Sequence, residues 1–272
     1  MTKTMNAAPF RCVRAGFSAA VFWAAVPVGA AAQQPPERDW TFTIGAAGFY
    51  APEFQGSKDY AFVAVPDLKV EYRDRFFASM FEGVGYNIVN SEGWRIGPIA
   101  KYAFGRDEDD HVALRGLGDV DDTIELGGFA QYSFDPFSVK LEMRQGLGGH
   151  EGLVGEADLS YSNSIEAFGP PIFFSVGPRA TFANDDYSNA FFGVTAAQSA
   201  RSGLARYKAE SGLVSYGIGG FVMMPITDSM SASAFVGYDR LGEEAADSPL
   251  VRQRGSENQF ILGLGLSYQF GF

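Results

Sequence analysis

Side chains that could support catalysis are few in this sequence. Its histidines are His111 and His150, and its single cysteine is Cys12. His150 lies in the segment GLGGHEG, residues 146–152, beside Glu151. A hydrolase that used a histidine as its base would need a serine placed against one of these two rings. The sequence shows no recognised nucleophile motif. We therefore predict no catalytic residue and no enzymatic activity, and expect His150 to shape a glycine-rich loop.

The glycines of residues 146–152 also raise the question of a phosphate-binding loop. Neither the Walker pattern nor the dinucleotide fingerprint is present, and no helical pattern follows the segment. Glycines at the rim of a β-sheet ordinarily serve turns and bulges. No cofactor is expected.

Carboxylates gather in one segment, where Asp107, Glu108, Asp109 and Asp110 are followed by three more aspartates between residues 119 and 122. Oxygen clusters of this kind suit hard cations such as calcium, but the spacing matches no EF-hand loop. We interpret the segment as a solvated loop whose carboxylates share divalent ions with neighbouring phosphate groups. The first four residues are candidates for a divalent-ion loop, and no metal site is assigned.

The N-terminus has the features of a secretory signal. Three basic residues precede an apolar run over residues 15–32 that ends in three alanines. The alternative is a membrane-anchoring helix, but Pro27 and Gly29 interrupt the run, which is short for a span. We predict that residues 1–32 form a cleaved signal peptide and that Gln33 begins the mature chain.

The mature chain, residues 33–272, is expected to be a single β-barrel domain without cysteine, because Cys12 leaves with the signal. It carries 18 basic against 32 acidic residues, a net charge of about −14, which excludes an electrostatic nucleic-acid binder. It contains no apolar run of about twenty residues, so a membrane-spanning helix is not predicted. The abundance of glycine, phenylalanine and tyrosine indicates a β protein.

Strict alternation gives the clearest elements. Residues 123–134 alternate with period two, Asp135 and Pro136 make a tight turn, and residues 137–144 alternate again, which predicts a hairpin with one apolar face. The same period recurs in the segments 40–46, 68–72, 96–104, 157–161, 172–182, 214–222, 230–238 and 260–272. Segments of about ten residues match tilted bilayer crossings.

The residue types on the face opposite the apolar one distinguish a membrane barrel from a soluble β-sandwich. Lys140, Glu142 and Arg144 on one strand and Glu125 and Gln131 on its neighbour are polar, which suits a barrel interior bridged by ion pairs. We therefore predict an all-β fold, a transmembrane antiparallel up-and-down β-barrel of twelve strands. Ten strands is the alternative.

The C-terminal strand ends in Phe272 and places seven large apolar residues of 260–272 on one face. An exposed soluble strand of this kind would aggregate, whereas hydrocarbon accepts it. The segment resembles the signal read by the barrel assembly machinery. Between Val63 and Gly93 the pattern is ambiguous, since residues 76–89 could form one bent strand or a short hairpin around Glu82 and Gly83.

Connection lengths give an orientation if the C-terminus is periplasmic. The connections at 135–136 and 225–229 are short. Long loops are expected at 105–122, 146–153, 184–210 and 240–257, all on the opposite, external side.

Several segments together resemble the MipA/OmpV family from Trp40 to Phe272. Their order along the chain makes the resemblance specific. They are GSKDY at 56–60, YRDRFF at 72–77, GVGYNIV at 83–89, GRDEDD at 105–110, LRGLGDVDDT at 114–123, RQGLGGHEGLVGE at 144–156, FFGVT at 191–195, SGLARY at 202–207 and DSPLV at 247–251.

The resemblance implies a barrel in the Gram-negative outer membrane, in contact with its lipid and lipopolysaccharide. The protein that names the family is a scaffold joining a murein-synthesising penicillin-binding protein to a lytic transglycosylase, so the resemblance implies this role and these partners. A peptidoglycan scaffold should offer its inner turns or the segment 33–39. A surface adhesin or stress-related protein should use the outer loops.

A narrow small-solute channel is the remaining alternative. Inward charges such as Lys140, Glu142 and Arg179 could line an aqueous path or plug it. Because ten to twelve strands enclose little space and Phe129 and Phe221 also point inward, we expect a closed or narrowly conducting barrel.

Overall fold

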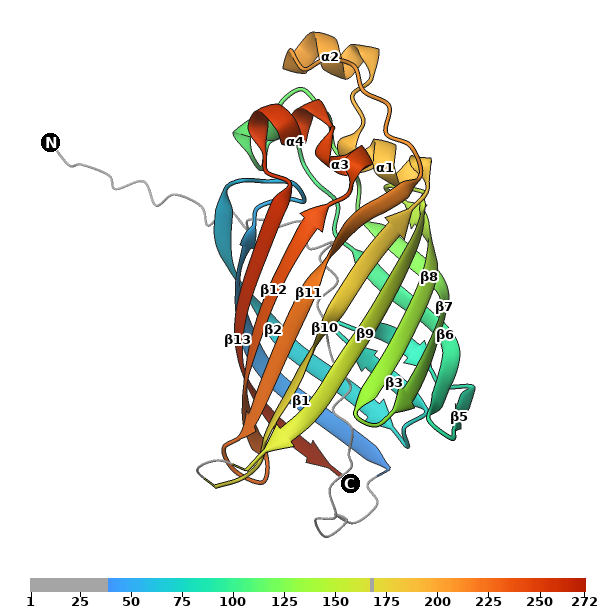
Figure 1. Cartoon of the computed structure of the whole chain (residues 1–272), viewed down its shortest axis with the longest axis vertical. Helices are drawn as coiled ribbons and strands as arrows, with labels where there is room; N and C mark the ends of the chain where they lie inside the picture. The colour runs from blue at the N-terminus through green and yellow to red at the C-terminus, as the bar shows by residue number, and fades with distance from the viewer. Residues whose placement is uncertain (1–38, 167–168) are drawn as a thin grey trace, which may run out of the picture.

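The strands of the chain form one antiparallel sheet that closes on itself as a barrel (Figure 1). The computed structural model describes residues 39–166 and 169–272. The described strands are β1 (Trp40–Pro52), β2 (Tyr60–Tyr72), β3 (Phe76–Ser79), β4 (Gly83–Tyr86), β5 (Val89–Ser91), β6 (Trp94–Ala103), β7 (Thr123–Phe134), β8 (Phe137–Gly148), β9 (Leu153–Ile165), β10 (Ile172–Ala183), β11 (Gly212–Pro225), β12 (Met230–Leu241) and β13 (Asn258–Gly271).

Closure has two parts. The first and last strands pair antiparallel from Thr41 opposite Gly271 to Tyr50 opposite Leu262. At the other end of the sheet, β4 and β5 both pair with β6, one beside each half of it. These two short strands therefore take the place of one, and the barrel has twelve strand positions, as the sequence predicted.

Residues 76–91 resolve the ambiguous stretch. β3 and β4 form a short hairpin with its turn at 80–82. The ladder beside β6 is then interrupted between Tyr86 and Val89, opposite Pro98. Proline has no N–H to donate to a ladder, and a Cβ on Gly97 would lie 1.7 Å from the Tyr86 carbonyl oxygen. The break follows from these two residues.

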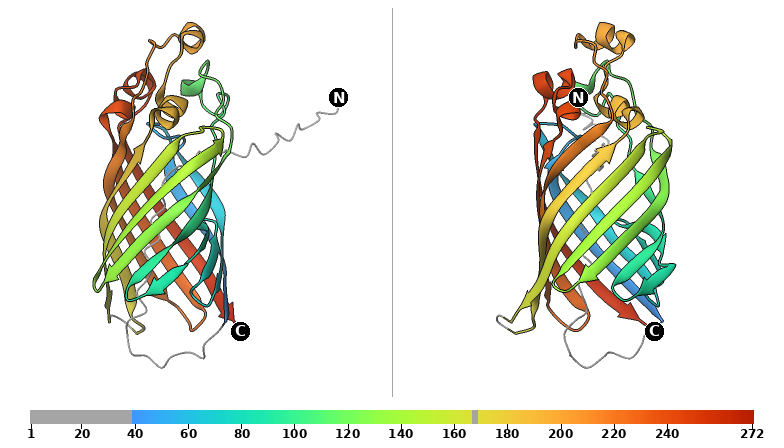
Figure 2. Two further views of the ribbon diagram at one scale, coloured as in Figure 1. Left: turned by 90° about the vertical axis from the view of Figure 1, so that its right-hand side faces the viewer. Right: turned by 45° about the vertical axis from the view of Figure 1, so that its right-hand side comes forward.

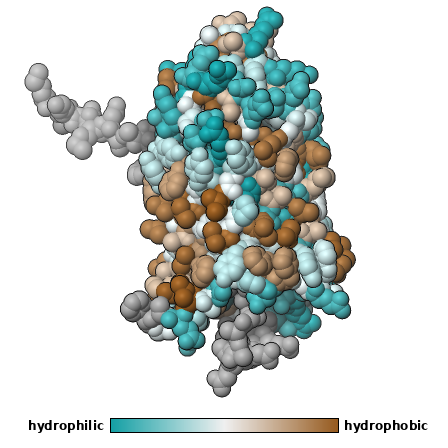
Figure 3. All heavy atoms as spheres, in the orientation of Figure 1, coloured by the Kyte–Doolittle hydropathy of each residue, from teal (hydrophilic) through white to brown (hydrophobic). Residues whose placement is uncertain are grey.

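The two faces of the wall differ in the way the alternation predicts. Leucine, phenylalanine and tyrosine point outward, including Leu262, Leu264 and Leu266 of β13. Figure 3 shows hydrophobic side chains across the middle of the barrel and hydrophilic ones at its upper end. Ring pairs such as Trp40 with Tyr72 gather toward the end where the chain terminates, as expected of an interfacial girdle.

The connections alternate between short and long. Those on the side of the C-terminus are brief, and three of those at the opposite end carry helices that stand above the barrel (Figure 2). The helices are the 3-10 turn η1 (Val112–Leu114), α1 (Asp185–Phe192), α2 (Ala196–Ser202), α3 (Glu243–Ala246) and α4 (Pro249–Arg254). None of the helices in the described part of the chain has the length and apolarity of a membrane span.

One of the four loops expected to be long is in fact short. β8 continues to Gly148 and β9 begins at Leu153, which leaves four residues between them. Gly148 and Gly149 both have positive φ, 87° and 34°, so the glycines form a tight turn where a loop was expected. The expected signal peptide, residues 1–32, lies outside the described residues.

The lipid-facing assignment of β13 predicts the effect of a charge at its centre. We expect Leu264→Arg to lower the free energy of unfolding in lipid vesicles by about 2–4 kcal/mol, because Leu264 faces hydrocarbon. Val112 in η1 is similarly exposed, 66% against 64% for Leu264. Val112→Arg should change the same quantity by less than about 0.5 kcal/mol. Equal effects of the two substitutions would contradict the membrane assignment of this face.

Candidate functional site

The outer end of the barrel is covered by a packed cap. Leu114, Leu204 and Leu250 come from three different outer connections, and each is 2% exposed or less. Ser248 is fully buried, and its hydroxyl donates to the Phe192 carbonyl oxygen at 2.6 Å. The apolar residues that form this cap core are Phe54, Ala113, Leu114, Leu117, Val194, Leu204 and Leu250. The outer loops therefore hold one another in place.

Arg106 lies under this cap. It exchanges two backbone hydrogen bonds with Val120 and donates from its side chain to the Phe191 carbonyl oxygen at 2.8 Å. Burial lowers the pKa of Arg106 to about 10, so the guanidinium stays charged at neutral pH. The hydrogen bond from its side chain links the connection after β6 to α1.

The acidic loop is organised around its own backbone. Glu108 accepts hydrogen bonds from the N–H groups of Gly116 and Gly118, and its own N–H donates to Asp119. Asp110 accepts from the Asp107 N–H at 3.4 Å. Nowhere in residues 39–166 or 169–272 do three or more carboxylate, histidine or cysteine side chains converge as a metal site. Asp107, Glu108, Asp109 and Asp110 are thus not brought together as ligands.

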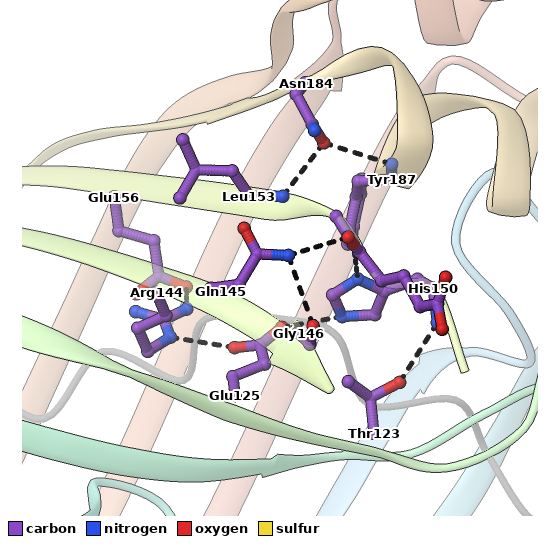
Figure 4. A network of polar contacts seen from close by, with 12 residues as sticks. Thr123, Glu125, Arg144, Gln145, Gly146, His150, Leu153, Glu156, Asn184 and Tyr187 are labelled. Atoms are coloured by element: carbon purple, nitrogen blue, oxygen red, sulfur yellow. Dashed lines mark hydrogen bonds and ion pairs between the residues drawn. The ribbon is translucent and has the colours of Figure 1, made fainter. Parts of the chain in front are cut away.

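His150 lies at the junction of the cap and the lumen (Figure 4). Its Nδ1 accepts the N–H of Gly152 at 3.0 Å, and its Nε2 lies 3.1 Å from Glu125 Oε1. One nitrogen accepts from a backbone N–H, so the ring proton is on Nε2 and is donated to Glu125. The His150 backbone N–H donates to Thr123 Oγ1. His150 orders the glycine turn, as its sequence context suggested.

Below His150, Arg144 of β8 is the centre of an ion-pair cluster inside the barrel. Its guanidinium donates to Glu125 at 2.8 Å, to Glu156 at 2.6 Å and to Glu142. Lys101 of β6 lies 2.6 Å from Glu142. The three carboxylates, Glu125, Glu142 and Glu156, come from three adjacent strands, β7, β8 and β9. The inward charges predicted from the alternation therefore neutralise one another across the wall.

The opposite side of the lumen is largely apolar. Arg179 of β10 makes a bidentate ion pair with Asp239 of β12. Beyond this pair, phenylalanine side chains meet, and the rings of Phe49 and Phe81 lie 5.7 Å apart, edge to face. The buried members of this cluster are Phe49, Ala51, Phe221, Phe235 and Ile261. On this side the sequence had placed Arg179 and Phe221 inward, but it did not predict the other members of the phenylalanine cluster.

The two histidines show what chemistry the arrangement supports. The polar partners of the His150 ring are Glu125 and a backbone N–H. Those of the His111 ring are the Ala113 N–H, Glu53 and Asp59. The arrangement orders loops and neutralises charge.

Comparison with known proteins agrees with this picture. A family model described as "MltA-interacting protein MipA" matches residues 44–270. YiaT of Escherichia coli (strain K12) is 27% identical over 235 residues, covering 84% of this chain and 90% of YiaT. "Outer membrane protein OmpV" of Vibrio cholerae is 24% identical over 238 residues, covering 86% of this chain and 88% of OmpV.

Solved membrane barrels are also similar. Pseudomonas putida OprB has a TM-score of 0.38 and 14% identity, over 76% of this chain and 59% of that one. A "bacterial polysaccharide outer membrane secretin" has a TM-score of 0.42 and 10% identity, over 85% of this chain and 98% of the other.

Removing the centre of the ion-pair cluster should destabilise the barrel. Arg144→Met leaves Glu125, Glu142 and Glu156 without their shared cation, and we expect the free energy of unfolding in vesicles to fall by about 3–5 kcal/mol. The matched control is Arg252→Met, which removes a pair with Asp247 whose side chains are 69% and 55% exposed and should cost about 0–1 kcal/mol. Similar losses in both variants would show that the cluster contributes no more to the free energy of unfolding than an exposed ion pair does.

The cap predicts one titration. Tyr207 donates to the Glu244 carbonyl oxygen at 2.8 Å, and burial together with the Glu244 carboxylate raises the pKa of Tyr207 to about 12. A raised tyrosine pKa means that the folded cap favours the neutral phenol. This contribution to stability is complete below about pH 10 and is lost as the pH rises through about 12. The ultraviolet difference titration of wild type against Tyr207→Phe should have its midpoint near pH 12, and a midpoint near 10 would contradict the packing.

Proposed function

Because the chain belongs to the MltA-interacting protein (MipA) family of outer-membrane β-barrels, we propose that it is a non-enzymatic scaffold of the cell envelope. It binds a lytic transglycosylase and a murein-synthesising penicillin-binding protein and holds them beside each other under the outer membrane. The observation that carries this proposal is the match of the MltA-interacting family model to residues 44–270. The barrel supplies the membrane anchor, and its periplasmic end supplies the docking surface.

A scaffold role is consistent with the polar groups of the lumen. The conspicuous charges inside the barrel are paired: Arg144 with carboxylates of the two adjacent strands, and Arg179 of β10 with Asp239 of β12. The outer mouth lies under the cap built on Leu114, Leu204 and Leu250. A transported solute would have to displace both, whereas a protein partner at the periplasmic rim would disturb neither.

The periplasmic rim carries a net negative charge that such partners can recognise. Its short turns carry six acidic residues, and arginines are its only basic ones in the described ranges. The acidic residues are Asp39, Asp74, Glu92, Asp135, Glu166 and Asp228. A rim of this composition favours partners that present a basic surface.

The barrel begins at this same rim. The Arg73 side chain donates to both carboxylate oxygens of Asp39, at 2.8 and 2.7 Å, and its backbone N–H donates to the Asp39 carbonyl oxygen. The hydrogen bond from Arg73 holds the pKa of Asp39 below its usual value. Asp39 is the one residue of the segment 33–39 within the described ranges, and it lies at this rim.

The remaining partners follow from the fold. β13 ends beside β1, and the aromatic face of its last residues is the part that we propose the barrel assembly machinery binds during insertion. Lipid contacts the outward side chains of every strand, and lipopolysaccharide is expected to contact the outer rim and its acidic loops.

In-cell photocrosslinking tests the scaffold. Photoreactive residues at Asp74 and Asp228, both exposed on periplasmic turns, should capture a lytic transglycosylase or a penicillin-binding protein identified by mass spectrometry. The matched positions Val112 and Arg252, exposed on outer loops, should not.

Two outcomes would count against this function. If the periplasmic positions capture no murein enzyme, the scaffold proposal fails. If, in addition, the outer positions trap host-surface or lipopolysaccharide ligands, the protein acts through its outer loops as a surface-binding protein.

A further inference from the structure

The barrel wall is incomplete between β2 and β6. Along one edge, β2 pairs with β1 from Trp40 opposite Tyr72 to Pro52 opposite Tyr60. Along its other edge, it pairs with β3 only from Lys69 to Tyr72. Within the described ranges, residues 60–68 therefore have no strand on that side. The β3–β4 hairpin is too short to fill the wall, and β4 reaches β6 only as far as Ala100.

This gap is at the depth of the outer half of the membrane. Residues 60–68 form the outer part of β2, and the turn at 80–82 marks the lower edge of the gap. Phe62, beside the gap, is 71% exposed on the lipid side. An unpaired strand edge next to hydrocarbon is costly. A gap here is expected to face something other than lipid tails alone.

Behind the gap, the lumen is apolar where a barrel interior is usually polar. Val65 of β2 and Phe81 of the hairpin turn pack against the cluster of Phe49, Phe221 and Phe235. Apart from Phe81 of the hairpin turn, these rings lie on β1, β11 and β12, within one run of adjacent strands, so they form a continuous apolar path from the gap toward β11 and β12.

A cavity lies on this path and contains a carboxylate. Its free space, including the part open to the rest of the lumen, is about 350 Å³, and Phe49, Phe81, Phe221, Phe235 and Asp67 line it. Asp67 is 6% exposed, and its Oδ1 has no hydrogen-bond partner among the described residues.

The charge around Asp67 is negative. The inward cation next to it on β2 is Lys69, which lies 3.1 Å from both Glu71 and Glu82. The charge of this ammonium group also acts on Asp67, so one cation serves three carboxylates, which together keep a net negative charge. A positive group in the cavity would neutralise Asp67 and lie against phenylalanine faces, an arrangement that favours ammonium ions.

We infer that the gap between β2 and β6 is a lateral opening for a cationic amphiphile of the alkylammonium type, whose apolar chain enters from the outer leaflet and whose ammonium group binds Asp67. This ligand site goes beyond the scaffold function and is independent of it. The rings bind the apolar chain, and the carboxylate selects the charge.

Binding to the protein in lipid nanodiscs tests the site. Decylammonium should bind, and Asp67→Asn should weaken its binding about tenfold or more, because a charge-assisted hydrogen bond is lost. Glu71→Gln, which removes an inward carboxylate of the same strand that is paired with Lys69, should leave the affinity within about twofold. Decanol, the uncharged analogue, should show no difference among the three proteins. Absence of decylammonium binding to the wild type, or equal binding to Asp67→Asn, would overturn the proposal.

The lateral route has a separate test, which does not depend on folding of an Asp67 variant. Val63 points inward beside the gap, and Thr181 points inward on β10, which is paired on both edges. An alkyl maleimide dissolved in the membrane should label Val63→Cys at least about tenfold faster than Thr181→Cys, since only the former is reachable from lipid. Equal rates would rule out the opening.

Discussion

The fold depends on one constraint, which is that backbone N–H and C=O groups in hydrocarbon must bond to each other. The pairing of β1 with β13 satisfies it by joining the two ends of the sheet. Once the sheet is closed, side chains must alternate between lipid and lumen, and turns must alternate between the two membrane faces. The inward charges and the outer cap are consequences of that closure. The interruptions of the ladder, opposite Pro98 and beside residues 60–68, are the places where the constraint is relaxed.

The lumen shows how such a barrel handles buried charge. Arg144 contacts carboxylates from three strands, and Lys101 adds a second cation. A buried ion pair is weak evidence for stability by itself, but breaking one leaves an uncompensated charge. The register of β7, β8 and β9 is thereby fixed, because a slip by one residue would turn these charges toward lipid. The apolar half of the lumen has no such network of charges to fix its register, and it contains the cavity beside Asp67.

The sequence predicted the strands and the direction of their side chains, because both follow from alternation with a period of two residues. Alternation located β7, β8 and β13 and identified their inward charges, and the family segments agreed with the family model. The pairing of Arg144 with Glu125 and Glu156 depends on the register between strands, which one strand's pattern does not contain. The β3–β4 hairpin was ambiguous because four-residue strands are too short to show a period. The cap was missed because its contacts join four connections that are distant in sequence.

Surface accessibility in intact cells tests the central claim that the barrel spans the outer membrane with its acidic turns inside. The mature chain has no native cysteine if the signal is removed, so single cysteines report cleanly. A thiol reagent that does not cross membranes should label Arg201→Cys of α2 in intact cells and Asp228→Cys only after the outer membrane is permeabilised. Labelling of Asp228→Cys in intact cells, or protection of Arg201→Cys, would contradict the account.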